Sequence, residues 1–391
     1  MKLLFTHRYY YPDTAPYALM LRSIAKHFAQ NGHDVHVFAS RLSYRDVENT
    51  PDTDDGDEVS VRRCWVFREN RRNILTRVLN VVLYCSGLFF AIIRQRPDIV
   101  TASTFPPVIA AWTASLAARI VGAKFVYHMQ DVHPEVSKFS GGRLGKGAFF
   151  RLLRWLDNQT LRRSSAVVVL SEDMADTLRA RNAGNFPISV INNFLLDSFG
   201  ATTSAPVELK KADGKFQVIF AGNLGRFQNL SLLAEGVSRC FNNHPELELF
   251  FLGDGAALPE LMENWGDHPQ VRFASFLPFS QASELIAGAD VGLVSLTPDI
   301  YRVSYPSKMM TYLGLGTPVL ALVEPESALA QEIEENGLGV VPAHPTPEAI
   351  EAALEKILSH SDHSSALADW NTKIASIDVV MRRWDKLVDA L

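Results

Sequence analysis

The stretch that decides the fold reads YRVSYPSKMMTYLGLGTPVL and occupies residues 301–320. It predicts a turn at Pro306, a short helix opened by Ser307 as N-cap and ended by two glycines, and a buried strand at Val319–Leu322. A helix N-terminus offers unpaired amide donors and the positive end of the helix dipole, and Lys308 adds a charge in the first turn. The stretch therefore predicts a phosphate-binding element, although an ordinary loop–helix–strand unit with a solvated lysine shares this pattern.

Apolar strands alternate with helix-length segments along the rest of the chain. In the first half the expected strands are Lys2–His7, Asp34–Ser40, Val61–Phe67, Ile99–Ala102, Lys124–His128, Ala166–Leu170 and Ile188–Ile191, and the expected helices are Ala18–Gln30, Ile74–Arg94, Pro107–Val121, Gly147–Arg162 and Glu172–Ala180. In the second half the expected strands are Phe216–Ala221, Glu248–Leu252, Val271–Phe273, Val291–Leu296, Val319–Leu322 and Gly339–Val341, and the expected helices are Leu230–Phe241, Leu258–Asn264, Gln281–Ala287, Ser307–Leu313, Ser327–Glu335, Pro347–Ser359 and Ala366–Leu391. Apolar strands separated by helices indicate the doubly wound α/β class, in which ligands bind beyond the carboxyl ends of parallel strands.

The length of 391 residues suits two domains of this class. A polar stretch without periodicity, residues 193–214, is the expected linker. We therefore expect a Rossmann-like domain over residues 1–200, a second over residues 201–365, and a last helix over residues 366–391. Two such domains facing a cleft form a common site for small ligands.

Charge is divided unevenly along the chain. Residues 1–195 hold 25 Lys and Arg against 17 Asp and Glu, whereas the remainder holds 13 against 26. The basic first half indicates an anionic partner, either a membrane surface or a phosphorylated acceptor. Nucleic acid is not expected, because the chain has no basic tract, RNP motif or zinc-finger spacing of the usual kind.

The apolar segments favour a cytoplasmic protein. The opening residues 1–7 predict a short strand and not a signal peptide, and the longest apolar segment, residues 78–93, is short for a membrane span. Arg68, Arg71, Arg72 and Arg77 precede that segment, so its helix either lies on an anionic membrane, such as the inner face of the plasma membrane, or covers the core with solvated ends. The three cysteines are far apart in sequence and predict buried, reduced thiols.

Three turns in the second half follow predicted strands. They are Gly222-Asn223-Leu224-Gly225-Arg226, Gly253-Asp254-Gly255 and Phe276-Leu277-Pro278. Glycines at a strand-to-helix turn let the backbone approach a phosphate, and Arg226 adds a charged contact. Each turn alone is equally typical of an ordinary α/β sheet.

Polar side chains gather at one strand end in the first half. Strand Lys124–His128 is followed by a loop that, with the end of the strand, supplies His128, Asp131, His133 and Glu135. Two imidazoles and two carboxylates at the edge of a parallel sheet indicate a site, and a hydrogen-bonded loop is the alternative. In the first strand-to-helix turn, Tyr11 and its neighbouring tyrosines either stack on a sugar or pack inside the domain.

The order and spacing of these motifs resemble the retaining glycosyltransferases of family 4, and nearly the whole chain is similar to bacterial members that transfer amino sugars into cell-surface polysaccharides. The resemblance implies the GT-B fold, with the last helix crossing back to the first domain. It implies that Ser307 and Lys308 support the diphosphate of a nucleotide sugar, and that the three turns contribute the remaining donor contacts. The family's paired glutamates fall at Val303 and Thr311, so the ribose contact of the family cannot be carried over. Arg226 would substitute for the family's arginine, which falls at Asn223.

The implied function is retaining transfer of a sugar, N-acetylated or deoxy-amino, from a UDP-sugar to a lipid-linked saccharide. Lys308 and Arg226 would stabilise the leaving diphosphate without a metal or another cofactor. Asp131 and His133 would orient or deprotonate the acceptor hydroxyl, with Tyr11, His128 and Glu135 on the acceptor side. Two alternatives stay open at this point: a nucleotide-sugar epimerase of the same architecture, and a non-catalytic nucleotide-sugar-binding subunit.

Overall fold

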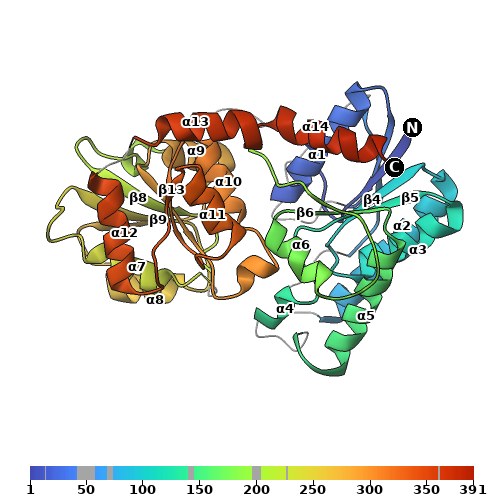
Figure 1. Cartoon of the computed structure of the whole chain (residues 1–391), viewed down its shortest axis with the longest axis horizontal. Helices are drawn as coiled ribbons and strands as arrows, with labels where there is room; N and C mark the ends of the chain where they lie inside the picture. The colour runs from blue at the N-terminus through green and yellow to red at the C-terminus, as the bar shows by residue number, and fades with distance from the viewer. Residues whose placement is uncertain are drawn as a thin grey trace. The chain divides into compact units, whose positions relative to one another are not determined.

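The structure is a computed structural model that describes residues 1–13, 15–41, 58–67, 74–139, 145–195, 204–225, 228–359 and 362–391. The chain divides into two compact units (Figure 1): the first comprises Met1–Asn192 with Met381–Leu391, and the second comprises Asn193–Val380. Arg68, Arg71, Arg72, Arg226 and the predicted boundary between residues 200 and 201 lie outside the described residues.

The first unit contains a parallel sheet of seven described strands in the order β3-β2-β1-β4-β5-β6-β7. These strands are β1 (Lys2–Thr6), β2 (Asp34–Ser40), β3 (Ser60–Cys64), β4 (Ile99–Ser103), β5 (Lys124–His128), β6 (Ala166–Val169) and β7 (Ile188–Val190). The helices are α1 (Pro16–Gln30), α2 (Ile74–Gln95), α3 (Ile109–Val121), α4 (Val136–Phe139), α5 (Gly147–Arg163) and α6 (Glu172–Arg179). Helix α2 packs on α3 and α3 packs on α5, so these three form one layer over the sheet.

The second unit contains a parallel sheet of six described strands in the order β10-β9-β8-β11-β12-β13. These strands are β8 (Phe216–Ala221), β9 (Leu247–Leu252), β10 (Val271–Ala274), β11 (Val291–Ser295), β12 (Val319–Leu322) and β13 (Gly339–Val340). The helices are η3 (Val207–Leu209), α7 (Leu230–Ser238), α8 (Leu258–Trp265), α9 (Phe279–Ala287), η4 (Ile300–Arg302), α10 (Ser307–Gly314), α11 (Ala328–Glu335), α12 (Pro347–Ser359), α13 (Ser364–Trp370), η5 (Asn371–Ala375) and α14 (Ile377–Asp389), the last of which continues into the first unit. The predicted doubly wound class is confirmed for both halves.

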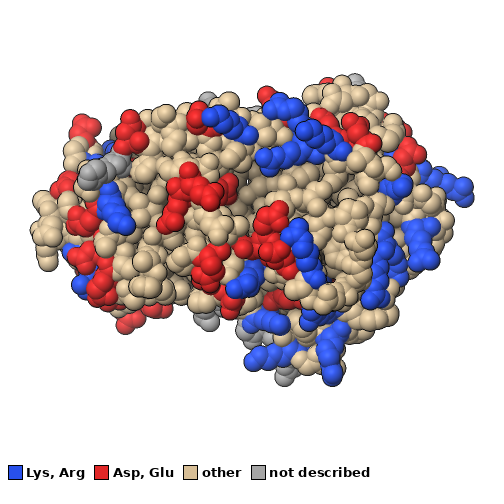
Figure 2. Space-filling model, in the orientation of Figure 1, with Lys and Arg blue, Asp and Glu red and all other residues tan. Residues whose placement is uncertain are grey.

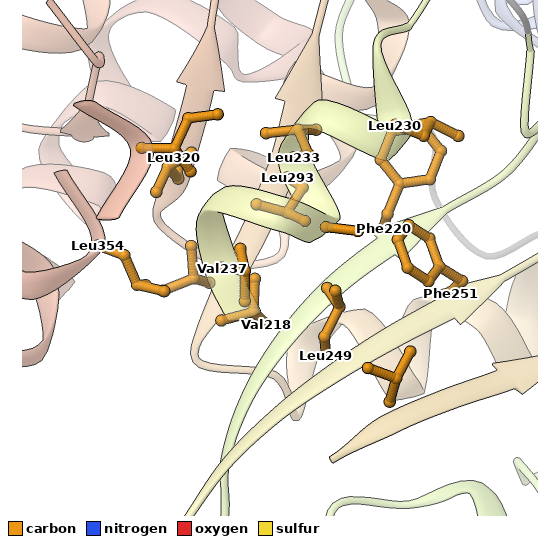
Figure 3. Packing of buried hydrophobic residues seen from close by; sticks show 14 of the residues in the cluster. Val218, Phe220, Leu230, Leu233, Val237, Leu249, Phe251, Leu293, Leu320 and Leu354 are labelled. Atoms are coloured by element: carbon orange, nitrogen blue, oxygen red, sulfur yellow. The ribbon is translucent and has the colours of Figure 1, made fainter. Parts of the chain in front are cut away.

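A buried apolar cluster joins the sheet of the second unit to α7 and α12 (Figure 3). Strand side chains from β8, β9 and β11 meet those of α7 in this cluster, and Phe220 and Phe251 lie near each other. Gly236 of α7 allows a close approach of the two helices, since a Cβ there would be 2.5 Å from the Cβ of Ile350 on α12. The same strands end at the candidate site, so this core fixes the position of the loops that follow them.

Several predicted elements have different bounds in the structure, and for two of them the physical reason is clear. The predicted strand Val61–Phe67 stops at Cys64, and beyond it the backbone of Phe67 exchanges two hydrogen bonds with the side chain of Asn80 on α2. The predicted helix Ala366–Leu391 is divided into α13, η5 and α14, because Ser376 takes an extended conformation. The carbonyl of Ser376 accepts the amides of the first turn of α14, so a new helix starts there.

Candidate functional site

Each sheet has one point at which the strand order reverses. In the second unit the chain adds β9 and β10 on one side of β8 and then β11 on the other, so the reversal lies between β8 and β11. In the first unit it lies between β1 and β4. Such points, beyond the carboxyl ends of the strands, are where doubly wound sheets bind ligands.

Strands β8 and β11 separate toward their carboxyl ends. Their register extends to Gly292 of β11, opposite Ile219 of β8. Ala221, at the end of β8, donates its amide to the hydroxyl of Tyr312 on α10 at 2.8 Å. The Tyr312 ring packs against Gly292, where a Cβ would be 2.6 Å from the ring. Helix α10 therefore places a buried side chain against both strands and satisfies the amide that strand pairing leaves.

Lys308 lies one helical turn before Tyr312 on α10, on the same side of the helix. Its ammonium lies 4.6 Å from the centroid of the Phe220 ring, and a Cβ at Gly222 would be 3.1 Å from its Cε. Burial lowers the pKa of Lys308 to about 8, and no charge from the described residues contributes to that shift. A partly desolvated ammonium at the point where the strand order reverses is suited to bind an anion.

The N-terminus of α10 differs from the prediction. The helix begins at Ser307, so the residue before it, Pro306, occupies the N-cap position, and no side chain caps the helix. The prediction of Ser307 as N-cap is wrong because Ser307 is already helical. The uncapped first turn leaves amide donors for solvent or a ligand, and this arrangement favours a phosphate beside Lys308. Thr311 Oγ1 donates to the Ser307 carbonyl at 3.5 Å, and Val303 is buried.

Two of the predicted ligand-binding glycines are needed for contacts between loops. A Cβ at Gly253 would be 1.9 Å from the carbonyl oxygen of Gly222, and one at Gly255 would be 2.2 Å from that of Leu224. The loops are also joined by hydrogen bonds, with the Leu224 amide donating to the Asp254 carbonyl at 3.0 Å. The glycine pair therefore permits the loops after β8 and β9 to pack backbone to backbone.

The remaining predicted donor residues of the described chain lie in these loops or the next one. Asp254 accepts the Phe276 amide at 3.2 Å, so it holds the loop after β10 against the loop after β9. Phe276 is exposed and Leu277 is partly buried. Asn223 is exposed, and Gly225 donates its amide to the side chain of Gln228 at 2.9 Å.

In the first unit an aromatic cluster lies at the ends of β1 and β5. The hydroxyl of Tyr17 lies 2.9 Å from His128 Nδ1, and the Tyr17 ring packs on His7 with centroids 4.7 Å apart. Trp384 of α14 packs edge-on against His128. Burial lowers the pKa of His7 to about 4 and that of His128 to about 3, so both imidazoles are neutral at pH 7. Sequence reasoning missed His7 and Tyr17, although both flank the first strand-to-helix turn, where ligands bind in this fold class.

A buried ion cluster fixes the loop after β5. Arg181 pairs with both Asp157 and Glu135 and donates to the His133 carbonyl at 2.6 Å. Tyr127 donates to Asp157 at 2.8 Å. The carboxylate of Glu135 is thus engaged by Arg181 inside the unit, which supports a role in positioning His133 over direct contact with an acceptor.

Asp131 and His133 both lie partly buried in that loop. Burial lowers the pKa of His133, and the negative charge of Asp131 opposes this shift. Tyr11 lies in the first strand-to-helix turn, with the guanidinium of Arg22 3.7 Å from its ring centroid. The adjacent Tyr9 and Tyr10 are buried, so packing is the observed arrangement for those two.

Two family models match this chain. The "Glycosyl transferase 4-like domain" matches residues 17–193, and "Glycosyl transferases group 1" matches residues 215–360. Together they span most of both units. The chain belongs to the family 4 type of glycosyltransferases, enzymes with the GT-B fold, so the family and the fold implied by the resemblance are confirmed.

Particular relatives agree with this family. The chain is 26% identical over 289 residues to the "Probable glycosyltransferase WbjE" of Pseudomonas aeruginosa, with 71% of each chain covered. It is 24% identical over 414 residues to the "Putative colanic acid biosynthesis glycosyl transferase WcaI" of Escherichia coli K12, with 98% of each covered. A similar solved structure is Anabaena Alr3699/HepE in complex with UDP and glucose, at 16% identity and a TM-score of 0.66 with both chains fully covered.

Proposed function

We propose that this glycosyltransferase moves a sugar, N-acetylated or deoxy-amino, from a UDP-sugar to a lipid-linked saccharide with retention at the anomeric carbon, in the synthesis of a cell-surface polysaccharide. The name of WcaI supports the polysaccharide role. The UDP complex of HepE supports UDP as the nucleotide of the donor. The sequence resemblance to amino-sugar transferases supports the class of sugar.

The observation that carries the proposal is the position of Lys308. Its ammonium lies beside Gly222 in the loop after β8, and Lys308 is one helical turn from Tyr312, which packs against β8 and β11. Burial disfavours the charged form of the lysine there, and an anionic ligand would restore it. A nucleoside diphosphate supplies such an anion at the uncapped first turn of α10.

The chemical role of these groups follows from how charge moves in the reaction. When the bond between the anomeric carbon and the diphosphate breaks, the leaving diphosphate gains negative charge. Lys308 and the first-turn amides of α10 would stabilise that charge more than they stabilise the intact donor. On the first unit, Asp131 or His133 would orient the acceptor hydroxyl and take its proton.

A nucleotide panel tests the donor half of the proposal. Purified protein is heated with UDP, GDP or ADP, and its unfolding is followed. A ligand at a hundred times its Kd stabilises a protein by about 2.7 kcal/mol, so UDP should raise the midpoint clearly above GDP and ADP. Equal shifts with all three nucleotides would contradict the choice of UDP.

The products test the reaction. Incubation with UDP-N-acetylamino sugars and a short-chain lipid diphosphate saccharide should give an extended lipid saccharide and free UDP, and NMR of the new linkage should show the anomer of the donor. An isomerised UDP-sugar formed without any acceptor would indicate the epimerase instead. UDP binding with neither product would indicate a non-catalytic subunit.

A further inference from the structure

The outer face of α2 is apolar. Between Arg77 and Arg94 this helix has no charged residue. Its exposed side chains include Ile74, Leu75, Val78, Val82 and Phe90, which are 71%, 77%, 58%, 54% and 68% exposed. A helix that covers a sheet in water normally presents a polar outer face. The outer face of α2 therefore needs an apolar partner outside this unit.

The inner face of α2 belongs to the core of the first unit. Tyr84, Leu88 and Ile92 are buried there, and a Cβ at Gly87 would be 3.2 Å from the Phe38 ring of β2. Among the described helices α2 alone is long and apolar enough to cross a membrane, with 22 residues. Crossing a bilayer would expose the sheet that α2 covers, so contact along its outer face is the consistent arrangement.

A second apolar stripe lies on α5. Phe149, Leu152 and Trp155 are about half exposed and are spaced three residues apart, so they share one side of this helix. Helix α3, rich in alanine, lies between α5 and α2. A shallow hollow of about 310 Å³ opens between α2 and α3, lined in part by Phe89 and Phe90. The three helices thus form one layer with two apolar stripes, which we call the α2–α5 face.

The solvent-accessible charges of this layer are all positive. The three helices contain seven arginines and a single acidic residue, Asp157, which is buried and paired with Arg181. Burial and the nearby charge of Arg119 lower the pKa of Arg163, so like charges crowd each other here. On the face drawn in Figure 2, Lys and Arg are numerous on the unit that carries these helices, and Asp and Glu are numerous on the second unit.

We propose that the α2–α5 face docks on the surface of an anionic bilayer. Its apolar side chains would enter the boundary between headgroups and acyl chains, and its arginines would contact lipid phosphates. A second copy of the chain fits poorly, because a twofold contact would place arginines against arginines with no exposed carboxylate on these helices to pair them. The proposal does not depend on which sugar the enzyme transfers.

Vesicle flotation with the full-length protein tests the proposal. Protein is mixed with phosphatidylcholine vesicles, with and without phosphatidylglycerol, at low and high salt. Binding should require phosphatidylglycerol and weaken with salt. The double variant Arg151→Gln/Arg162→Gln should bind the vesicles about fivefold more weakly for each arginine removed. The double variant Val82→Gln/Phe90→Gln should bind them at least about tenfold more weakly than the parent protein.

Matched controls lie on the second unit. Met262→Gln removes an apolar side chain of similar exposure, and Lys356→Gln removes an exposed cation; both should float like the parent protein. Circular dichroism checks that each variant is folded. Failure of the parent protein to float with anionic vesicles at low salt would overturn the proposal, as would a dimer in sedimentation that Val82→Gln/Phe90→Gln dissociates. UDP binding by the same samples reports on the donor site separately.

Discussion

Lys308 combines two properties at the scale of a single residue. It is charged in water, and in the folded chain burial lowers its pKa to about 8. Its position beside Gly222 and in the first turn of α10 favours the binding of an anion there. A bound diphosphate would therefore offset the cost of burying the ammonium.

Lys308→Ala should lower kcat more than it raises the KM for the UDP-sugar. A contact that strengthens as charge develops typically contributes about 10²–10³ in rate. Steady-state kinetics measure both constants, and Lys356→Ala on the exposed side of α12 serves as the control. Transfer at the parental rate by a folded Lys308→Ala protein would rule out α10 as the donor site.

The affinity for UDP should fall with rising pH. In the protein without a ligand, Lys308 has a pKa of about 8. A bound diphosphate favours the charged form of Lys308, so above that pH the protein takes up a proton when UDP binds. Calorimetric titration should show binding about tenfold weaker at pH 9 than at pH 7. Lys308→Met removes the titrating group and should make the affinity nearly constant over this range. An identical pH dependence in the variant would assign it to another group.

Asp131→Asn should reduce turnover and leave UDP affinity nearly unchanged. The residue lies in the loop after β5 on the first unit, whereas the proposed diphosphate contacts lie on the second unit. An amide of the same shape cannot take a proton from an acceptor hydroxyl. The assay compares kcat with the Kd for UDP, and unchanged turnover would limit this loop to a structural role.

At the scale of elements, the proposed donor half of the site consists of three loops that contact one another. The loop after β8 contacts that after β9 through Gly253, Gly255 and the amide of Leu224. Asp254 joins the loop after β10 to the same group. These contacts explain why glycines recur here without requiring that each touch a ligand.

Gly253→Ala should be strongly destabilising and should weaken UDP binding. Its φ is +139° and its Cβ would overlap the Gly222 carbonyl, so we expect a loss of about 3–5 kcal/mol in the free energy of unfolding. Gly316→Ala is the matched control, because φ is +81° but no atom lies within 4 Å; backbone strain alone should cost about 1–2 kcal/mol. Urea unfolding measures both. Equal losses would show that contact between the loops is unimportant.

At the scale of the whole molecule, the two units differ in net charge and in the ligand proposed for each. The first half of the chain is basic and the second acidic. Anionic ligands are nevertheless proposed on both units, so the proposed donor site in the acidic half would depend on local groups, Lys308 and the helix amides, and not on net charge. The proposed bilayer contact depends on the basic α2–α5 face.

Transfer should not require a divalent ion. In the described part of the chain no group of three His, Cys, Asp or Glu side chains could hold a metal, and the proposed phosphate contacts are an ammonium and backbone amides. EDTA should therefore leave the rate unchanged. Activity lost with EDTA and restored by magnesium or manganese would contradict this expectation.

The sequence determined the class of fold and indicated the stretches that form its candidate site. Periodicity placed every strand that the structure describes within a few residues, because an apolar strand between helices is a local pattern. The glycine turns and the α10 stretch also carried enough order and spacing to indicate the family. Asn80 and Gly87 interrupt the apolar pattern of α2, but their partners, the Phe67 backbone and the Phe38 ring, are not readable from that pattern.

Only the tertiary structure decided what those residues do. Strand order is set by which strands pair, so the separation of β8 from β11 and the hydroxyl of Tyr312 that meets Ala221 appear only in three dimensions. The same holds for Glu135, which the sequence placed on the acceptor side and folding pairs with Arg181, 46 residues further along the chain. Such roles depend on contacts between distant segments, and a local pattern of residues contains no information about which distant segment will supply the partner.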